Sequence, residues 1–143
     1  MGVAATEVAS GTNWNLDDEG TLNVTGKSIT ADSLSSVDKT LIKKVKVDYA
    51  YWCALDVGAN AFEGCTNLES VEFPNSGATV SITIGNEAFK GCSKFKGFNI
   101  KSTKLTIYSV GTDAFSGTLA TSGVTCTNGT DYILDGYGVL TIG

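Results

Sequence analysis

The stretch Val57-Gly58-Ala59-Asn60-Ala61-Phe62-Glu63-Gly64 decides the fold, because the same pattern returns twice further along the chain. It returns as IGNEAFKG at 84–91 and as VGTDAFSG at 110–117. All three copies fit [VI]-G-x-x-A-F-x-G, and their phenylalanines stand 27 and 26 residues apart. Fixed positions at a near-constant spacing indicate structural repeats, each of which must stack on its neighbours to bury its apolar face.

Short extended runs flank each copy of the motif. CTNLESVEFP follows at 65–74 and CSKFKGFNI at 92–100, and IKKVKV at 42–47 supplies an earlier equivalent. The alternation of apolar and polar residues in these runs predicts strands, and similar runs that precede the motifs predict a second set. The first glycine of each motif is expected to start a short helical turn, and the last to end it with a positive φ.

These residues resemble the BspA-type leucine-rich repeat family of bacterial surface proteins, whose units carry I-G-x-x-A-F-x-x-C-x-x-L-x-x-I-x-I-P. The resemblance covers roughly residues 42–118, with slightly longer units around 75–79 and Thr118 where the third unit would have cysteine. Repeat and resemblance together predict a β-rich α/β solenoid with flanking β-hairpins. It is expected to be a short leucine-rich-repeat right-handed superhelix of about three to four rungs, with Val124-Thr125-Cys126 as a further, degraded rung.

A second repeat brackets the first. GTNWNLDDEGTLNV at 11–24 matches GTDYILDGYGVLTI at 129–142, at a constant offset of 118 residues. Each copy predicts a β-hairpin around a turn of Asp and Gly. The hairpins are either caps on the open ends of the solenoid, or the second copy begins the next unit of a longer tandem protein.

A single domain over 1–143 is therefore expected, with an N-terminal cap hairpin at 10–26, repeats at 42–126 and a C-terminal hairpin at 128–143. Between the first hairpin and the repeats, 32–41 predicts a short helix capped by Asp32, with Leu34, Val37 and Leu41 turned inward.

Composition argues against several classes of function. The 143 residues carry a net charge of −5, which disfavours nucleic-acid binding, and no apolar run is long enough to insert in a membrane. The chain has no histidine, so Ser-His and Cys-His catalytic pairs are impossible. We expect no enzymatic activity and no cofactor.

Four cysteines, Cys53, Cys65, Cys92 and Cys126, raise the question of disulfides or metal. Without histidine or C-x-x-C spacing, a zinc site is not expected. Cys65 and Cys92 hold equivalent places on successive rungs, where their Cβ vectors should run parallel, and this suits a disulfide poorly. The favoured interpretation is a buried ladder of small apolar thiols, with a disulfide as the alternative.

The outward face of the first predicted sheet is the leading candidate site. Stacking in register places Lys44, Ser70 and Gly97 in one row, and Lys46, Glu72 and Asn99 in the next. Lys46 and Glu72 would form a cross-strand pair. Flat ladders of this kind can make extended binding surfaces, and the alternative is a face that only keeps the chain soluble. The second sheet would align Asp56, Thr83 and Tyr108.

Tyr49, Tyr51 and Trp52 form the aromatic cluster of the sequence. Exposed together, they would contact a protein or a carbohydrate. Alternatively, they pack against the N-terminal hairpin and its Trp14.

The family resemblance implies a non-enzymatic, adhesin-like interaction module that binds a protein of the host or cell surface. It also implies a secreted or cell-surface location. The small, polar run after Met1-Gly2 is typical of a chain that starts after a removed export signal, so we expect such a signal to have preceded it. Two alternatives stay open: a carbohydrate-binding module that takes a glycan through its aromatic cluster, and a structural spacer repeat in a longer surface protein.

Overall fold

The computed structural model describes residues 5–47, 53–73, 80–99, 105–119, 124–125, 131–134 and 140–142. These residues form strands and two short 3₁₀ helices, and none of them lies in an α-helix. The helices are η1 (Asp32–Leu34) and η2 (Lys39–Leu41). The strands are β1 (Glu7–Gly11), β2 (Trp14–Asp17), β3 (Thr21–Val24), β4 (Ser28–Ile29), β5 (Lys44–Val47), β6 (Cys53–Val57), β7 (Ser70–Glu72), β8 (Val80–Ile84), β9 (Gly97–Asn99), β10 (Leu105–Val110), β11 (Val124–Thr125), β12 (Asp131–Leu134) and β13 (Leu140–Ile142).

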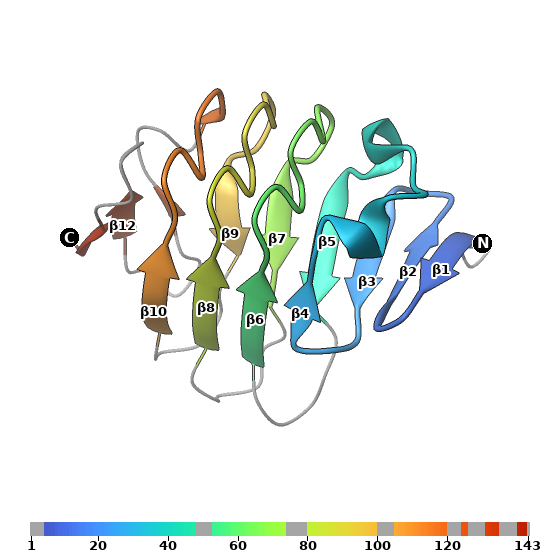
Figure 1. The fold of residues 1–143 in the computed structure, drawn as a ribbon, viewed down its shortest axis with the longest axis horizontal. Coiled ribbons are helices and arrows are strands. Elements are labelled where there is room, and N and C mark those ends of the chain that lie inside the picture. The colour runs from blue at the N-terminus through green and yellow to red at the C-terminus, as the bar shows by residue number, and fades with distance from the viewer. Residues whose placement is uncertain are drawn as a thin grey trace, which may run out of the picture.

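Two parallel ladders build the molecule. The chain alternates between them, so that β3, β5, β7 and β9 pair in one sheet while β4, β6, β8 and β10 pair in the other. We call the first sheet A and the second sheet B. Figure 1 shows the strands side by side from the N-terminal end at the right to the C-terminal end at the left. The predicted repeat-based, strand-rich fold is confirmed, but its α component is wrong within the described residues.

Sheet A begins earlier in the chain than the predicted repeats. The N-terminal hairpin forms as expected, with Trp14 opposite Val24 and Leu16 opposite Leu22. Its second strand, β3, also pairs in parallel with β5, placing Val24 beside Val47. β1 then adds an antiparallel strand on the outer side of β2. The hairpin is therefore part of the ladder as well as its cap. The sequence repeat did not show this, because the 23-residue spacing from β3 to β5 is shorter than that of the repeats.

The segments after β6, β8 and β10 form the third side of each unit, along the upper edge in Figure 1. The short helical turn expected here is a hydrogen-bonded turn instead, because the residue before each motif alanine has a left-handed backbone. These are Asn60, Glu87 and Asp113, with φ of 61°, 55° and 56°. The closing glycines have the predicted positive φ: Gly64 at 81°, Gly91 at 78° and Gly117 at 76°.

Stacked turns bond to one another through the backbone. The Phe62 N–H donates to the Ala88 carbonyl at 2.8 Å, and the Phe89 N–H donates to the Ala114 carbonyl at 2.8 Å. These bonds satisfy groups that a helix would have bonded internally. The turns therefore form a third ladder, in register with the two sheets.

One continuous hydrophobic cluster fills the space between the sheets and the turns, from Trp14 to Phe115. The motif phenylalanines stack in it: ring centroids lie 5.3 Å apart between Phe62 and Phe89, and 5.4 Å apart between Phe89 and Phe115. The 27- and 26-residue spacing in the sequence is thus the length of one unit, which returns each ring to the same place.

Residues 32–41 differ from the predicted helix. They contain η1 and η2, and Asp32 makes no capping hydrogen bond to η1. Leu34 is fully buried as expected, but Leu41 is 49% exposed. Asp38 caps η2 instead by accepting from the Thr40 N–H, and the Thr40 hydroxyl and N–H hold the Asp38 pKa below its ordinary value.

The C-terminal hairpin pairs as the N-terminal one does. Tyr132 lies opposite Ile142 and Leu134 opposite Leu140, the same register shifted by 118 residues. β11 pairs antiparallel with β12. Residues 124–125 therefore belong to this C-terminal sheet and not to a further rung of the two parallel ladders.

Candidate interaction surface

The outward face of sheet A carries the two predicted rows. Lys44 lies beside Ser70 and Ser70 beside Gly97, while Lys46 lies beside Glu72 and Glu72 beside Asn99. These positions alternate with buried Val45, Val71 and Phe98, so the pattern of the sequence assigned them to the correct face.

The second row is longer than the repeats alone suggested. Lys46 also lies beside Asn23, and Asn23 lies opposite Asn15 of the hairpin. The Asn23 side-chain amide donates to Asn15 Oδ1 at 3.0 Å. Sequence reasoning missed both asparagines, although their alternation with buried Leu16, Leu22 and Val24 carried the signal. One polar row thus crosses β2, β3, β5, β7 and β9.

The ion pair on this face involves a different lysine from the expected one. Lys46 and Glu72 are cross-strand neighbours as predicted, but Glu72 Oε1 lies 3.6 Å from Lys44 Nζ, on the diagonal. Lys46 is exposed, whereas Lys44, Ser70 and Glu72 are half-buried. A solvent-accessible pair of this kind contributes about 0–1 kcal/mol, so it fixes the face only weakly.

The outward face of sheet B follows the predicted rows up to its last strand. Asp56 lies beside Thr83 as expected. In β10 the register shifts between Ile107 and Ser109, so that Ser109 and not Tyr108 lies beside Thr83. β10 is the edge strand of sheet B, where such irregularities are common.

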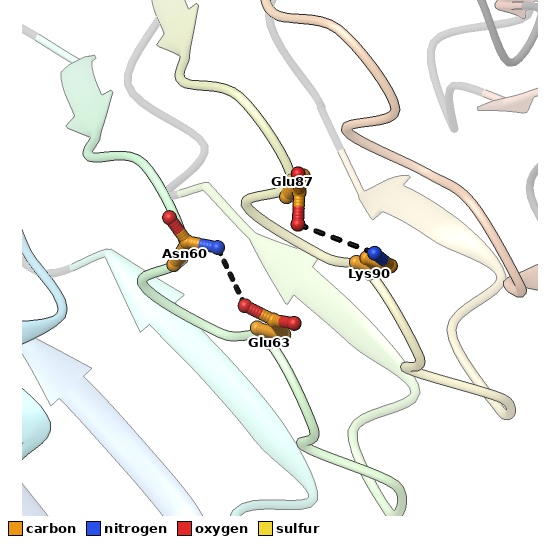
Figure 2. A network of polar contacts seen from close by, with 4 residues as sticks. All are labelled: Asn60, Glu63, Glu87 and Lys90. Carbon is orange, nitrogen blue, oxygen red and sulfur yellow. Dashed lines mark hydrogen bonds and ion pairs between the residues drawn. The ribbon is translucent and has the colours of Figure 1, made fainter.

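The turns present a separate polar edge, and each of the first two turns holds one bonded pair of side chains. Figure 2 shows Asn60 donating to Glu63 on one turn and Lys90 bonded to Glu87 on the next, the latter at 3.3 Å. These are local contacts within three residues of sequence. Among the described residues, no group of three His, Cys, Asp or Glu side chains could hold a metal ion.

Cys65 and Cys92 lie inside the turns as free, fully buried thiols. The Cys92 thiol donates to the Phe62 carbonyl at 3.0 Å. The hydrogen bond between the two thiols and their burial raise the pKa of Cys65, so its thiol stays protonated at neutral pH. The predicted thiol pair is confirmed, while the side chains of Cys53 and Cys126 lie outside the described residues.

Part of the predicted site also lies outside the described residues: Tyr49, Tyr51, Trp52 and the side chain of Asn99. Trp14, the expected packing partner of the aromatic cluster, is 4% exposed. A Cβ placed on Gly11 would lie 2.4 Å from the Trp14 Nε1, so Gly11 covers this ring closely.

The family model for the BspA type leucine rich repeat region, in six copies, matches residues 55–137, which is more than half of the chain. The chain belongs to this family. The match includes the Phe62–Phe89–Phe115 stack, whose geometry explains why the motif repeats. No curated protein and no solved structure matches the chain.

BspA-type repeats are typically extracellular or surface-associated, and membership of this family suggests a surface repeat module. Within the part of the chain that the structure describes, no helix has the length and hydropathy needed to cross a membrane.

Proposed function

We propose that the chain is a non-enzymatic interaction module, secreted or held at a cell surface, that binds a protein partner in an adhesin-like manner. The binding surface is the outward face of sheet A. The observation that carries this proposal is the row of polar side chains from Asn15 to Glu72, which lies in register across neighbouring strands.

Several features of this face favour a macromolecular partner. It is regular, because β3, β5, β7 and β9 are parallel neighbours with no register shift between them. It offers donors and acceptors from short side chains, and a weak ion pair that a partner can exchange at low energetic cost. The lack of histidine supports a binding role over acid–base catalysis.

We also infer that the two ladders form a right-handed superhelix of four rungs. Parallel strands in one sheet that are joined by a crossover connect with a right hand in nearly all proteins. The outward face would then follow a gentle twist along the four parallel strands β3, β5, β7 and β9.

An array of extracellular-matrix and cell-surface proteins tests the proposed function. We expect the chain to bind at least one protein, and Ser70→Trp to weaken that binding about tenfold or more, because the indole would cover the centre of the face. Thr83→Trp is the matched control, since Thr83 is half-buried on the outward face of sheet B. No binding across the array, or equal losses in both variants, would overturn the proposal.

A further inference from the structure

Two of the exposed apolar side chains meet in one place. Among the described residues, the exposed large hydrophobics are Val8, Leu41 and Leu119, at 54%, 49% and 56%. Val8 and Leu41 are 33 residues apart in the chain, yet both line a pocket of about 250 Å³ at the N-terminal end of the molecule. Typical small-molecule pockets are larger, about 300–1,000 Å³, so this one suits one or two side chains.

A β-bulge in β1 holds Val8 at the rim of this pocket. Glu7 lies opposite Asp17 and Ala9 opposite Leu16, so Val8 is the extra residue of the strand. Ala9 packs against the core. Bulges at sheet edges redirect a side chain, and this one leaves Val8 exposed while its neighbour is covered.

β1 also offers a backbone edge that no other described strand covers. It is the last strand of sheet A in the part of the chain that the structure describes, and it pairs there only with β2. On the far side of the bulge, Thr6 is bonded to Asp18: its carbonyl accepts from the Asp18 N–H at 2.8 Å, and its N–H donates to Asp18 Oδ1 at 3.1 Å. These two bonds to Asp18 anchor the start of β1, and an anchored edge strand can accept a further strand from a partner.

Charge around the pocket specifies the partner. Glu7 lies directly opposite Asp17, and like charges at such positions repel one another. Asp17 and Asp18 line the pocket together with a single cation, Lys43. A basic side chain placed between Glu7 and Asp17 would relieve this repulsion, so the surface favours a cationic ligand.

We propose that the outer edge of β1 and the Val8–Leu41 pocket bind an extended peptide segment of a partner protein. The segment adds as a strand to β1, one apolar side chain enters the pocket, and flanking Lys or Arg side chains pair with Glu7 and the Asp17–Asp18 turn. This site is separate from the row on the face of sheet A and does not depend on its function.

A fluorescent peptide of sequence Lys-Val-Lys-Leu-Lys-Val is the probe, with binding to the full chain followed by anisotropy. We expect saturable binding that weakens with added salt. Two control peptides carry glutamate in place of each lysine, or proline in place of each valine, since proline removes the N–H that strand pairing needs. Each control should bind about tenfold more weakly or worse.

Variants then locate the site. Val8→Ser and Leu41→Ser each remove apolar contact from the pocket and should weaken the lysine peptide about tenfold. Leu119→Ser is the matched control, because Leu119 is equally exposed but does not line this pocket. Ser70→Trp should also leave peptide binding unchanged, which separates this site from the one on sheet A. Unfolding midpoints of all variants check that the fold is retained.

Four results would overturn the proposal. The first is no binding of the lysine peptide, and the second is equal binding of the proline or glutamate peptide. The third is equal weakening by Leu119→Ser. The fourth is a dimer of the chain alone that Leu41→Ser abolishes, which would assign the pocket to a second copy of the chain.

Discussion

At the scale of single residues, the first glycine of the second and third motif copies is required by close backbone contact between stacked turns. A Cβ on Gly85 would lie 2.5 Å from the Ala59 nitrogen, and a Cβ on Gly111 would lie 2.3 Å from the Asn86 nitrogen. The equivalent Gly58 stacks on residues 29–30, where the turn motif is absent, and its nearest contact would be 3.4 Å. The same motif position is therefore constrained in the second and third copies and relaxed in the first.

We predict that Gly85→Ala lowers the free energy of unfolding by about 1–3 kcal/mol, the usual effect of overpacking. Gly58→Ala should change it by less than about 1 kcal/mol, because alanine fits and restricts the unfolded chain. Urea unfolding followed by circular dichroism measures both values. Similar losses in the two variants would show that stacking contact is not the reason for the glycine.

The positive φ of the closing glycines was readable in the sequence at this scale, whereas the left-handed residue before each motif alanine and the choice of side-chain partner were not. The positive φ of Gly64, Gly91 and Gly117 follows from their place at the end of each turn. Glu72, by contrast, has Lys44 and Lys46 within reach on one neighbouring strand. Long flexible side chains on an exposed face differ by only fractions of a kcal/mol between such partners.

At the scale of elements, the turns are held together by stacked aromatic rings as well as by backbone bonds. Phe89 is the centre of this stack. It lies parallel to Phe62, Phe95 and Phe115, and edge-on to Phe98 at 5.9 Å. Phe62, at the N-terminal side, contacts one of these rings, Phe89.

Phe89→Leu should therefore destabilise the protein by at least about 1 kcal/mol more than Phe62→Leu. Leucine keeps most of the apolar volume at both sites, but only the Phe89 variant loses four ring contacts, each worth about 0.5–1.5 kcal/mol. Unfolding midpoints and slopes in urea give the difference. Equal effects would mean that volume, and not ring stacking, dominates the core.

The strands and hairpins could be predicted because alternation and turn residues define them locally. The first unit could not, because β4 has only two residues and η1 and η2 replace the turn motif after it. The inward position expected for Leu41 failed for a related reason: a single helix would bury one stripe, whereas two 3₁₀ helices separated by Ser35 to Asp38 do not keep that period.

At the scale of the whole molecule, stability should depend on the N-terminal cap, because each unit contacts mainly its neighbours. Trp14 is the large buried ring of this cap and lies opposite Val24 at the start of the parallel ladder. The N–H groups of Gly58, Gly85 and Gly111 donate to Ile29, Val57 and Ile84, one bond for each successive unit.

We predict that Trp14→Ala lowers the free energy of unfolding by about 3–5 kcal/mol. Amide hydrogen exchange should show protection falling most at Gly58, less at Gly85 and least at Gly111, because unfolding would start at the damaged end. A uniform loss at the three amides would instead indicate that the chain unfolds only as one cooperative unit.

Much of the candidate surface on sheet A was predictable, since it depends on period and register alone. The Val8–Leu41 pocket was not, because it requires a bulge in β1 and an outward Leu41, and neither leaves a mark in the pattern of apolar residues. A pocket between elements depends on how far the end of each element lies from its neighbours, and the local sequence does not specify this distance.

The third ladder has a consequence for how members of such a family can diverge in length. On the turn side, 12 residues link β6 to β7 and again β8 to β9, and an insertion there would break backbone bonds to both neighbouring turns. The links from sheet A to sheet B have 3, 5, 7 and 5 residues, at 25–27, 48–52, 73–79 and 100–104. Doubling a link costs only about 0.6 kcal/mol in chain entropy. Length therefore varies between the links from sheet A to sheet B, whereas the turn side stays at 12 residues, and a foreign epitope grafted into a turn by evolution or by an engineer would break the third ladder.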